Sequence, residues 1–283
     1  MNGIRLGRMR HSRRWLILVC TAFAVGTSSS TISSTGAKII SQADIPEQSA
    51  AYADVSETVC SNPQGEIADA ASTVVQNGEY EKPAVLHANR ESPGKVALTF
   101  DDGPHPKLTA PILDLLAQYG IKATFFTIGM NAQTNPGLVE RELAEGHEVG
   151  NHTQTHPNLA ELSYQEVYDE VLAAEKAVFS ESEYKTHLLR PPGGNVGENV
   201  MRLAKNLNYD LILWSVDTRD WAHTDADTII RTVNDNVKSG DVILFHDYVS
   251  GEAHTLEALK QLIPQLISRG YEFVTVSELF GLK

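Results

Sequence analysis

From Gly94 to the C-terminus, short apolar runs rich in β-branched and aromatic residues alternate with longer amphipathic stretches. Short runs of this kind are typical of buried strands, and the amphipathic stretches have the spacing of helices. Several helical stretches end in Gly, which often follows a helix C-terminus. The strand candidates are KVALTF, KATFFTIG, HEVGNH, THLLRP, YDLILWSV, DVILFHD and YEFVTV, and the helix candidates include APILDLLAQYG, TNPGLVERELAEG, YQEVYDEVLAAEKAVF, ADTIIRTVNDNVKSG and TLEALKQLIPQLISRG.

Regular alternation of strands and helices predicts an α/β fold with parallel strands. A barrel is the simplest architecture for such a chain. The alternating part has about 190 residues, which is short for eight βα units, since these typically take ~250 residues. We therefore predict a distorted (β/α)7-type barrel that forms a single domain over 93–283. A doubly wound open sheet is the alternative.

Charged and imidazole side chains follow five of the seven predicted strands. Because the chemistry of such barrels gathers at the carboxyl ends of the strands, we expect these side chains to face one another. They are Asp101 and Asp102 after the first strand, His152 after the third, Arg190 after the fourth, Asp217 and Asp220 after the fifth, and His246 and Asp247 after the sixth.

The motif HTQTH places His152 and His156 four residues apart, so that both imidazoles can reach one metal ion. This spacing alone is a weak signal, because histidines four apart are often chance neighbours at the surface. A carboxylate from another strand end would complete a set of two His and one acid. Such a set leaves a position open for water, as in catalytic rather than structural zinc sites. No cysteine clusters with the two histidines, which excludes a thiolate site.

The stretch TFDDGP places two acids, Asp101 and Asp102, side by side. Taken alone, it indicates a capped turn. Beside a cation, one carboxylate could bind the ion while the other accepts a proton from water, and the ion would offset the repulsion between them. We expect the alternation of side chains along the strand to point the two acids in different directions.

In chain order, TFDDGPHP, HTQTH, RPPGG, DTRDW and LFHD resemble the five motifs of the polysaccharide deacetylases, carbohydrate esterase family four. The stretch GIKATFFTIGMNAQTNPGLVERELAEGHEVGNHTQTHPNL is also similar to that family, and the resemblance covers roughly 93–283. It implies a distorted (β/α) barrel that hydrolyses acetyl groups from polysaccharides. It also implies one divalent metal ion as cofactor, usually Zn²⁺, with Co²⁺ or Ni²⁺ as alternatives.

The resemblance implies a division of roles between the first motifs. Asp102, His152 and His156 would bind the metal ion. Asp101 would be the general base that activates the attacking water. Arg190, from RPPGG, would pair with Asp101 and keep it ionised and oriented.

The remaining motifs would supply the general acid and the substrate contacts. Asp220 would pair with His246 and favour its protonated form, so that His246 can protonate the leaving amine. The backbone N–H of Gly193, together with the metal ion, would stabilise the oxyanion. Leu244 and Trp221 would line a small pocket for the acetyl methyl group.

The motif RPPGG departs from the family pattern at one position. Many relatives have an aromatic residue after RPP, whereas this chain has Gly193 followed by Gly194. The backbone donor is retained, but an aromatic side chain that could shape the substrate groove is missing. We expect the departure to alter subsite preference more than catalysis.

The N-terminus has the layout of a secretory signal. Five arginines precede the apolar run WLILVCTAFAV, and the small, polar stretch GTSSSTISSTG follows it. The run is short for a transmembrane helix, which needs ~20 residues. We predict a signal peptide or signal anchor at 1–26, a flexible spacer at 27–92, and a protein that is secreted or membrane-anchored and acts outside the cell, at the cell wall.

The chain carries 23 Lys and Arg against 36 Asp and Glu, a formal net charge of −13. This acidic excess argues against nucleic acid as a partner, and we expect membrane contact only through an N-terminal anchor. The expected partner is an acetylated polysaccharide, with N-acetylglucosamine in peptidoglycan as the first prediction. Chitooligosaccharides and acetylxylan are alternatives, since the same attack by water opens esters. A non-catalytic carbohydrate-binding protein is the contrasting class.

Overall fold

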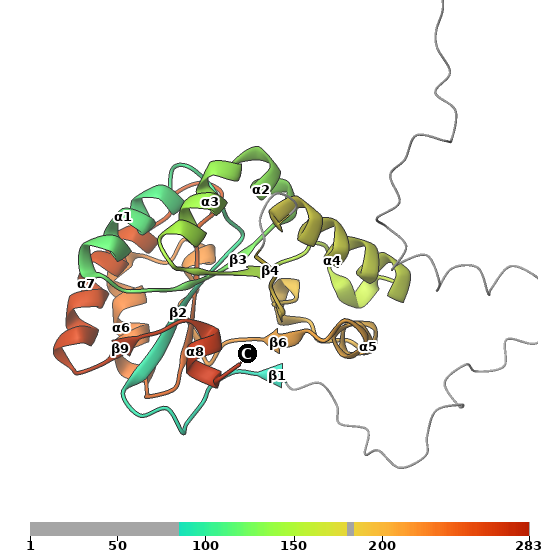
Figure 1. The fold of residues 1–283 in the computed structure, drawn as a ribbon. Helices are drawn as coiled ribbons and strands as arrows, with labels where there is room; N and C mark the ends of the chain where they lie inside the picture. Colours follow the sequence, from blue (N-terminus) through green and yellow to red (C-terminus); the bar gives the residue numbers. More distant parts are fainter. Residues whose placement is uncertain (1–84, 180–183, 283) are drawn as a thin grey trace, which may run out of the picture. The chain divides into compact units, whose positions relative to one another are not determined.

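The computed structural model describes residues 85–179 and 184–282 of the chain (Figure 1). The segment predicted as a signal at 1–26 lies outside the described residues, as does most of the spacer predicted at 27–92. Among the helices of the described residues, none is both long enough and apolar enough to cross a membrane.

The strands form one curled sheet in which every pair of neighbouring strands is parallel. Their order across the sheet is β1-β6-β5-β4-β3-β2-β8-β7, and β9 pairs with β2 outside this path. The strands are β1 (Val85–Leu86), β2 (Lys95–Asp101), β3 (Thr124–Thr127), β4 (Glu148–Asn151), β5 (Leu188–Leu189), β6 (Asp210–Ile212), β7 (Val216–Asp217), β8 (Val242–His246) and β9 (Glu272–Phe273).

One stretch of chain, 210–217, links the two sides of the curled sheet. Its first part, β6, pairs with β5 and β1, whereas its last part, β7, pairs with β8. Between them, the N–H of Leu213 donates to the carbonyl of Leu86 at 2.8 Å, and the N–H of Ser215 donates to the carbonyl of Val242 at 3.0 Å. The sequence predicted YDLILWSV as one strand. It forms two, because the chain changes partners midway to close the barrel.

Eight α-helices are present in the described residues, and the five helical segments named from the sequence correspond to α1, α3, α4, α6 and α7. In Figure 1, α1, α6 and α7 lie at one side of the sheet, and α4 and α5 lie at the other. The helices are α1 (Thr109–Tyr119), α2 (Gly129–Thr134), α3 (Pro136–Ala144), α4 (Tyr164–Phe179), α5 (Glu198–Leu207), α6 (Ala226–Asn236), α7 (Thr255–Ser268) and α8 (Val276–Phe280), with short 3₁₀ turns at Leu159–Glu161, Pro192–Gly194 and Asp220–Ala222.

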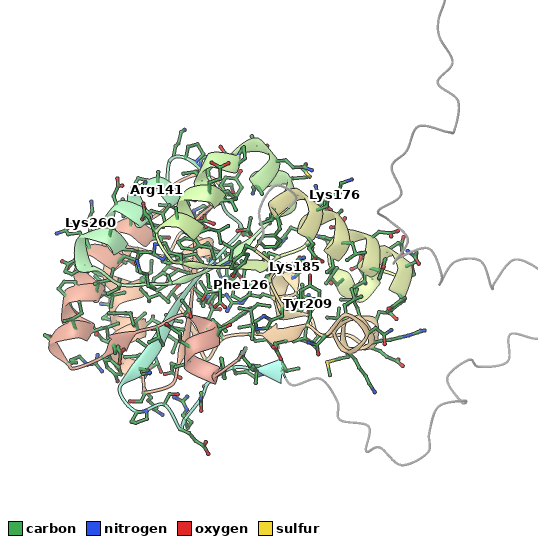
Figure 2. All side chains as sticks on the ribbon, viewed as in Figure 1. Phe126, Arg141, Lys176, Lys185, Tyr209 and Lys260 are labelled. Atoms are coloured by element: carbon green, nitrogen blue, oxygen red, sulfur yellow. The ribbon has the colours of Figure 1, made fainter. Side chains whose placement is uncertain are left out.

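The central strand β2 fixes the position of the site. All of its residues after Lys95 are buried, as expected for a parallel strand covered on both faces. The ring of Phe100 stacks on Phe125 of β3 at 5.0 Å and lies 5.9 Å from Phe245 of β8. Figure 2 shows Phe126 in the interior of the molecule. Because the core locks these strands together, their carboxyl ends present a rigid set of side chains.

The folded domain begins earlier than the sequence predicted. Strand β1, at Val85–Leu86, pairs with β6 and lies within the predicted spacer. Asn89 and Ser92 both donate side-chain hydrogen bonds to the carbonyl of Leu279, at 2.7 and 2.9 Å. The predicted boundary at residue 93 is therefore too late, because a strand of two residues has no periodicity that marks it in the sequence.

Candidate active site

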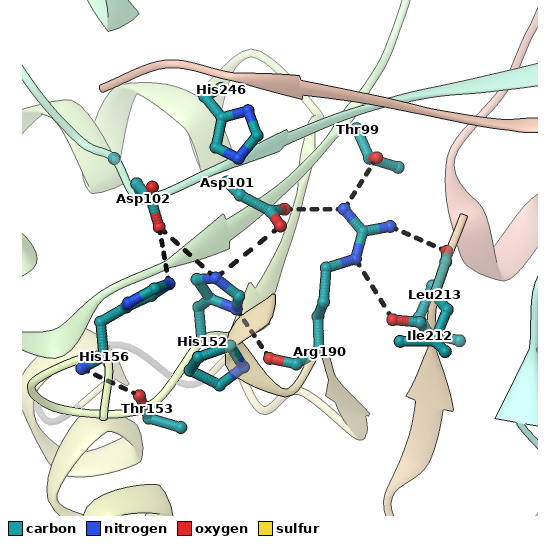
Figure 3. A network of polar contacts seen from close by, with 12 residues as sticks. Thr99, Asp101, Asp102, His152, Thr153, His156, Arg190, Ile212, Leu213 and His246 are labelled. Carbon is teal, nitrogen blue, oxygen red and sulfur yellow. Dashed lines mark hydrogen bonds and ion pairs between the residues drawn. The ribbon is translucent and has the colours of Figure 1, made fainter. Parts of the chain in front are cut away.

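Three side chains at the carboxyl end of the sheet form a candidate metal site. One donor atom from each of Asp102, His152 and His156 lies within 4.8 Å of the other two. Oδ1 of Asp102 is 3.5 Å from Nε2 of His152 and 3.3 Å from Nε2 of His156 (Figure 3). This oxygen is buried and accepts no hydrogen bond from the described residues. An unpartnered carboxylate oxygen that faces two imidazoles fits a divalent cation.

Asp102 points toward the imidazoles because the backbone turns there. Strand β2 ends at Asp101, and Asp102 follows it with a φ of 75°, in the left-handed region. Nδ2 of Asn131 donates to the carbonyl of Asp102 at 2.6 Å and holds this turn. The expectation that strand alternation separates the two acids is wrong, since only Asp101 lies in the strand. The left-handed turn, which Asp tolerates better than most residues, separates them.

Burial and a neighbouring histidine act in opposite directions on Asp102. Burial alone would raise the pKa of Asp102, but its contact with His152 and the charge of that imidazole outweigh burial and lower the pKa. The carboxylate is therefore ionised at neutral pH, as a metal ligand must be.

The orientation of His152 is set from the side opposite the site. Strand β4 ends at Asn151, so His152 follows it directly. Nδ1 of His152 donates to the carbonyl of Arg190 at 2.7 Å, which leaves Nε2 to face Asp102. The side chain of His156 is 39% exposed and closes the outer edge of the site.

Asp101 is held by a buried arginine. Nη1 of Arg190 donates to Oδ1 of Asp101 at 2.7 Å, and both residues are buried. Oδ2 of Asp101 is 3.7 Å from Nε2 of His152 and so faces the metal site. Since its other N–H groups are also engaged, Arg190 is fixed in place. They donate to the hydroxyl of Thr99 at 2.8 Å and to the carbonyls of Ile212 and Leu213 at 3.2 and 3.1 Å (Figure 3).

His246 is paired with Asp220, which is fully buried. Nδ1 of His246 donates to Oδ1 of Asp220 at 2.7 Å, and the backbone N–H of His246 donates to Oδ2 at 2.8 Å. The hydroxyl of Thr255 donates to the same Oδ2 at 2.7 Å. Burial alone would lower the pKa of His246, but the hydrogen bond and charge of Asp220 outweigh it and raise the pKa to about 9. The imidazole is therefore protonated at neutral pH.

The register of the sheet brings the Asp101–Arg190 pair close to the Asp220–His246 pair. Asp101, the last residue of β2, lies opposite His246, the last residue of β8, in the pairing of these parallel strands. Figure 3 shows His246 beside Asp101 and Asp102. A proton acceptor and a proton donor thus lie at neighbouring strand ends, next to the candidate metal site.

The three residues predicted to contact substrate occupy different environments. Gly193 is exposed with a φ of 62°, and its N–H donates no hydrogen bond within the described part of the chain. Leu244 is buried in β8, on the same face as His246 because the two are separated by one residue. Trp221 follows Asp220 directly and is 49% exposed.

Several residues that support the site carry no sequence signal. Thr99 and Thr255 are buried hydroxyl donors or acceptors for Arg190 and Asp220, yet isolated threonines in apolar segments are ordinary. Asp247, the acid that follows His246 in the sequence, accepts hydrogen bonds from the N–H of Gly103 at 2.9 Å and from the hydroxyl of Thr109 at 2.6 Å.

A barrel of parallel strands that holds a cation site beside a buried base and a protonated imidazole defines a class of protein, the metal-assisted hydrolases.

Known proteins identify the family within this class. The family model described as "Polysaccharide deacetylase" matches residues 88–212. A peptidoglycan-N-acetylglucosamine deacetylase of Bacillus cereus is 45% identical over 191 residues, 66% of this chain and 89% of that protein. A chitooligosaccharide deacetylase of Bradyrhizobium is 40% identical over 196 residues, 65% of this chain and 90% of that protein. This chain belongs to the polysaccharide deacetylase family.

Solved structures agree with this assignment. The Bc1960 peptidoglycan N-acetylglucosamine deacetylase gives a TM-score of 0.69 at 40% identity, over 72% of this chain and 95% of that chain. A pseudoenzyme of carbohydrate esterase family four from Bacillus anthracis gives a TM-score of 0.66 at 29% identity, over 71% of this chain and 70% of that chain. The predicted distorted barrel is confirmed, and the family is metal-dependent.

Proposed function

We propose that this chain removes N-acetyl groups from N-acetylglucosamine residues of a polysaccharide, with peptidoglycan as its substrate. The observation that carries the proposal is the register of β2 and β8, which sets Asp101 beside His246 at the edge of the Asp102–His152–His156 site. The names of the relative from Bacillus cereus and of the Bc1960 structure support peptidoglycan. The name of the relative from Bradyrhizobium supports chitooligosaccharides as the second candidate.

Asp102, His152 and His156 would hold the metal ion, which fits Zn²⁺ best because two imidazoles and one carboxylate suit a catalytic zinc site, with Co²⁺ or Ni²⁺ as alternatives. When bound, such an ion acts as a Lewis acid and lowers the pKa of water. Arg190 occupies Oδ1 of Asp101, so Oδ2 remains to accept the proton of the attacking water.

The other groups act on the substrate. The free N–H of Gly193 donates to the carbonyl oxygen of the acetyl group as it gains negative charge. His246, held protonated by Asp220, gives its proton to the sugar nitrogen as the C–N bond breaks. The products are acetate and a free amine. Leu244 and Trp221 would shape the pocket for the methyl group.

We place this reaction outside the cell. The signal-like layout of 1–26 supports export, and a polymer of the cell wall is accessible only there. The segment 27–84 would then separate the catalytic domain from a membrane anchor or a cleaved N-terminus.

Acetate release from peptidoglycan, N-acetylglucosamine oligomers and acetylxylan tests the function, with and without a chelator. We expect release from peptidoglycan that stops on metal removal and returns with added Zn²⁺. Acetylxylan as the best substrate would contradict the proposal. Since the family includes a pseudoenzyme, no release from any of the three would assign the chain to the non-catalytic class.

The value of kcat/KM should fall at high pH. It falls above about pH 9, as His246 loses the proton that it would donate. Asp220→Asn removes the charge that raises the pKa of His246, so the upper limb should move down by about one pH unit or more. A profile that is flat, or an upper limb that Asp220→Asn leaves in place, would contradict the acid role of His246.

Three exposed apolar side chains follow the carboxyl ends of strands of the sheet. Met130 follows β3, Trp221 follows β7 and Tyr248 follows β8, all at least 38% exposed. The ring of Tyr248 also packs against His105 at 4.9 Å. Sugar rings bind aromatic faces through their apolar C–H surfaces, so Trp221 and Tyr248 would bind sugar residues of the polymer next to the reacting one.

Tyr248→Ala should therefore raise KM about three- to tenfold for an N-acetylglucosamine tetramer, while kcat stays unchanged. The loss should shrink as the oligomer is shortened, and Tyr248→Phe should behave as wild type. Ile267→Ala, at an exposed position on α7, is the matched control. An equal effect of Tyr248→Ala on all oligomer lengths would contradict binding of a neighbouring sugar.

A further inference from the structure

The loop 152–156, which carries two of the three metal-site residues, is held between two helices. On one side, the first N–H groups of α2 donate to its carbonyls, from Gly129 to Thr153 at 3.0 Å and from Met130 to Gln154 at 3.1 Å. On the other side lies α4. The two helices are so close that a Cβ at Gly129 would lie 2.9 Å from the Cα of Ala174 in α4.

Glu170 of α4 binds the opposite edge of this loop. Its Oε2 accepts hydrogen bonds from the N–H groups of Gln154 at 3.0 Å and Thr155 at 2.8 Å. Its Oε1 accepts a third from the hydroxyl of Thr155 at 2.8 Å. One carboxylate therefore satisfies two consecutive backbone donors and the side chain between the two histidines.

The backbone of the loop needs such support. Thr153 has a φ of 67° and His156 a φ of 59°, both in the left-handed region that residues with a Cβ rarely adopt. Only one hydrogen bond inside the loop opposes this strain, from the N–H of His156 to the hydroxyl of Thr153 at 3.1 Å. The strand ends and α2 supply further hydrogen bonds, among them that from the N–H of Thr153 to Oδ1 of Asn151 at 2.8 Å. The hydrogen bonds from α4 are made by Glu170.

We propose that Glu170 is a positioning residue for the metal site, which fixes the loop between His152 and His156 in the conformation that places both imidazoles on Asp102. His156 depends on it most, because its side chain is 39% exposed, whereas His152 is buried and donates from Nδ1 to the carbonyl of Arg190. Residues that orient metal ligands typically contribute about 10- to 100-fold in metal affinity. This inference rests on the metal site of the proposed function.

Zn²⁺ binding to the metal-free protein, measured by competition with a chelating dye, tests the inference. Glu170→Ala should weaken Zn²⁺ affinity about 10- to 100-fold. Asp169→Ala is the matched control, because Asp169 is the exposed acid beside it on α4 and accepts a hydrogen bond from Gln165 rather than from the loop. It should leave the affinity unchanged.

Two further variants separate positioning from charge. Glu170→Gln keeps the length and the acceptor oxygen, and its amide can donate to the hydroxyl of Thr155, so affinity should remain within about threefold of wild type. Glu170→Asp keeps the charge but is too short to reach both N–H groups, so it should weaken binding as Glu170→Ala does. Glu170→Asp also carries the test if Glu170→Ala does not fold.

Each result supports or overturns the inference. Wild-type affinity in Glu170→Asp and Glu170→Ala would overturn it, and so would a loss in Glu170→Gln with full affinity in Glu170→Asp, which would indicate a purely electrostatic role. A wild-type protein that binds no Zn²⁺ would instead defeat the proposed metal site.

Discussion

Asp101→Asn is expected to lower kcat/KM about 10²- to 10⁴-fold while Zn²⁺ still binds. The substituted amide can accept the hydrogen bond of Arg190 through its oxygen, but it cannot accept a proton from water. Asp102 and the two imidazoles are unchanged in this variant, so the donor set for the ion is intact. Acetate release and Zn²⁺ titration on the same preparation measure the two properties separately.

His152→Ala gives the complementary result. It removes one of three donors, and the carbonyl of Arg190 loses its partner as well, so both Zn²⁺ binding and turnover should be lost.

The fold of Asp101→Asn must be checked by thermal unfolding, because this variant loses a negative charge beside the buried Arg190 and is destabilised. If Asp101→Asn abolishes Zn²⁺ binding in a folded protein, the division of roles between Asp101 and Asp102 is wrong.

The paired charges of the site were predictable because each belongs to a motif at a strand end. Asp101 with Arg190, and Asp220 with His246, make the contacts that the motifs imply. Their hydroxyl partners were not predictable. Thr99 lies 91 residues from Arg190, and nothing in either local segment indicates the contact. Such partners are set by packing across the barrel.

The fold was predictable to the extent that its elements repeat. The alternation of apolar runs and amphipathic helices predicted the parallel architecture, because a helix between two strands lets the second strand run parallel to the first. Strand β1 was missed because it precedes the region in which strands and helices alternate, and the break between β6 and β7 was missed because both strands lie in one apolar run. The direction of Asp102 was missed because a single left-handed residue leaves no pattern.

A buried acid outside the site leads to the other large expected effect. Glu142 lies in α3, on the face that also buries Val139, and it is fully buried. Neither carboxyl oxygen has a hydrogen-bond partner among the described residues. A buried polar group without a partner destabilises a fold by about 1–3 kcal/mol. The amphipathic pattern of the helix did not reveal it, because Glu142 occupies an apolar position.

The free energy of unfolding should depend on pH because of Glu142. Burial raises the pKa of Glu142 well above its usual value, and the charge of Asp247 adds to the effect. Above ~pH 4.3, the unfolded chain releases this proton while the native state keeps it. The native state then binds more protons, so the free energy of unfolding falls by about 1.4 kcal/mol per pH unit until the native group titrates. Below ~pH 4.3 Glu142 is protonated in both the native and the unfolded state, so it no longer makes the free energy of unfolding depend on pH.

Glu142→Leu should therefore raise the free energy of unfolding by at least about 1–3 kcal/mol at neutral pH, with a gain that shrinks toward pH 4. Urea unfolding of the metal-free protein between pH 4 and 8 measures it, with Glu140→Leu, at an exposed position of the same helix, as the control. Glu142→Gln should remove the part of the pH dependence of the free energy of unfolding that comes from Glu142. It should still be less stable than Glu142→Leu, because the amide is also a buried polar group without a partner. Because burial raises the pKa of Asp247 to about 7, a shallower slope should remain in both variants up to that pH. If Glu142→Leu is less stable than wild type at pH 7, Glu142 has a stabilising partner, and the buried, unpaired acid is not a weak point of the fold.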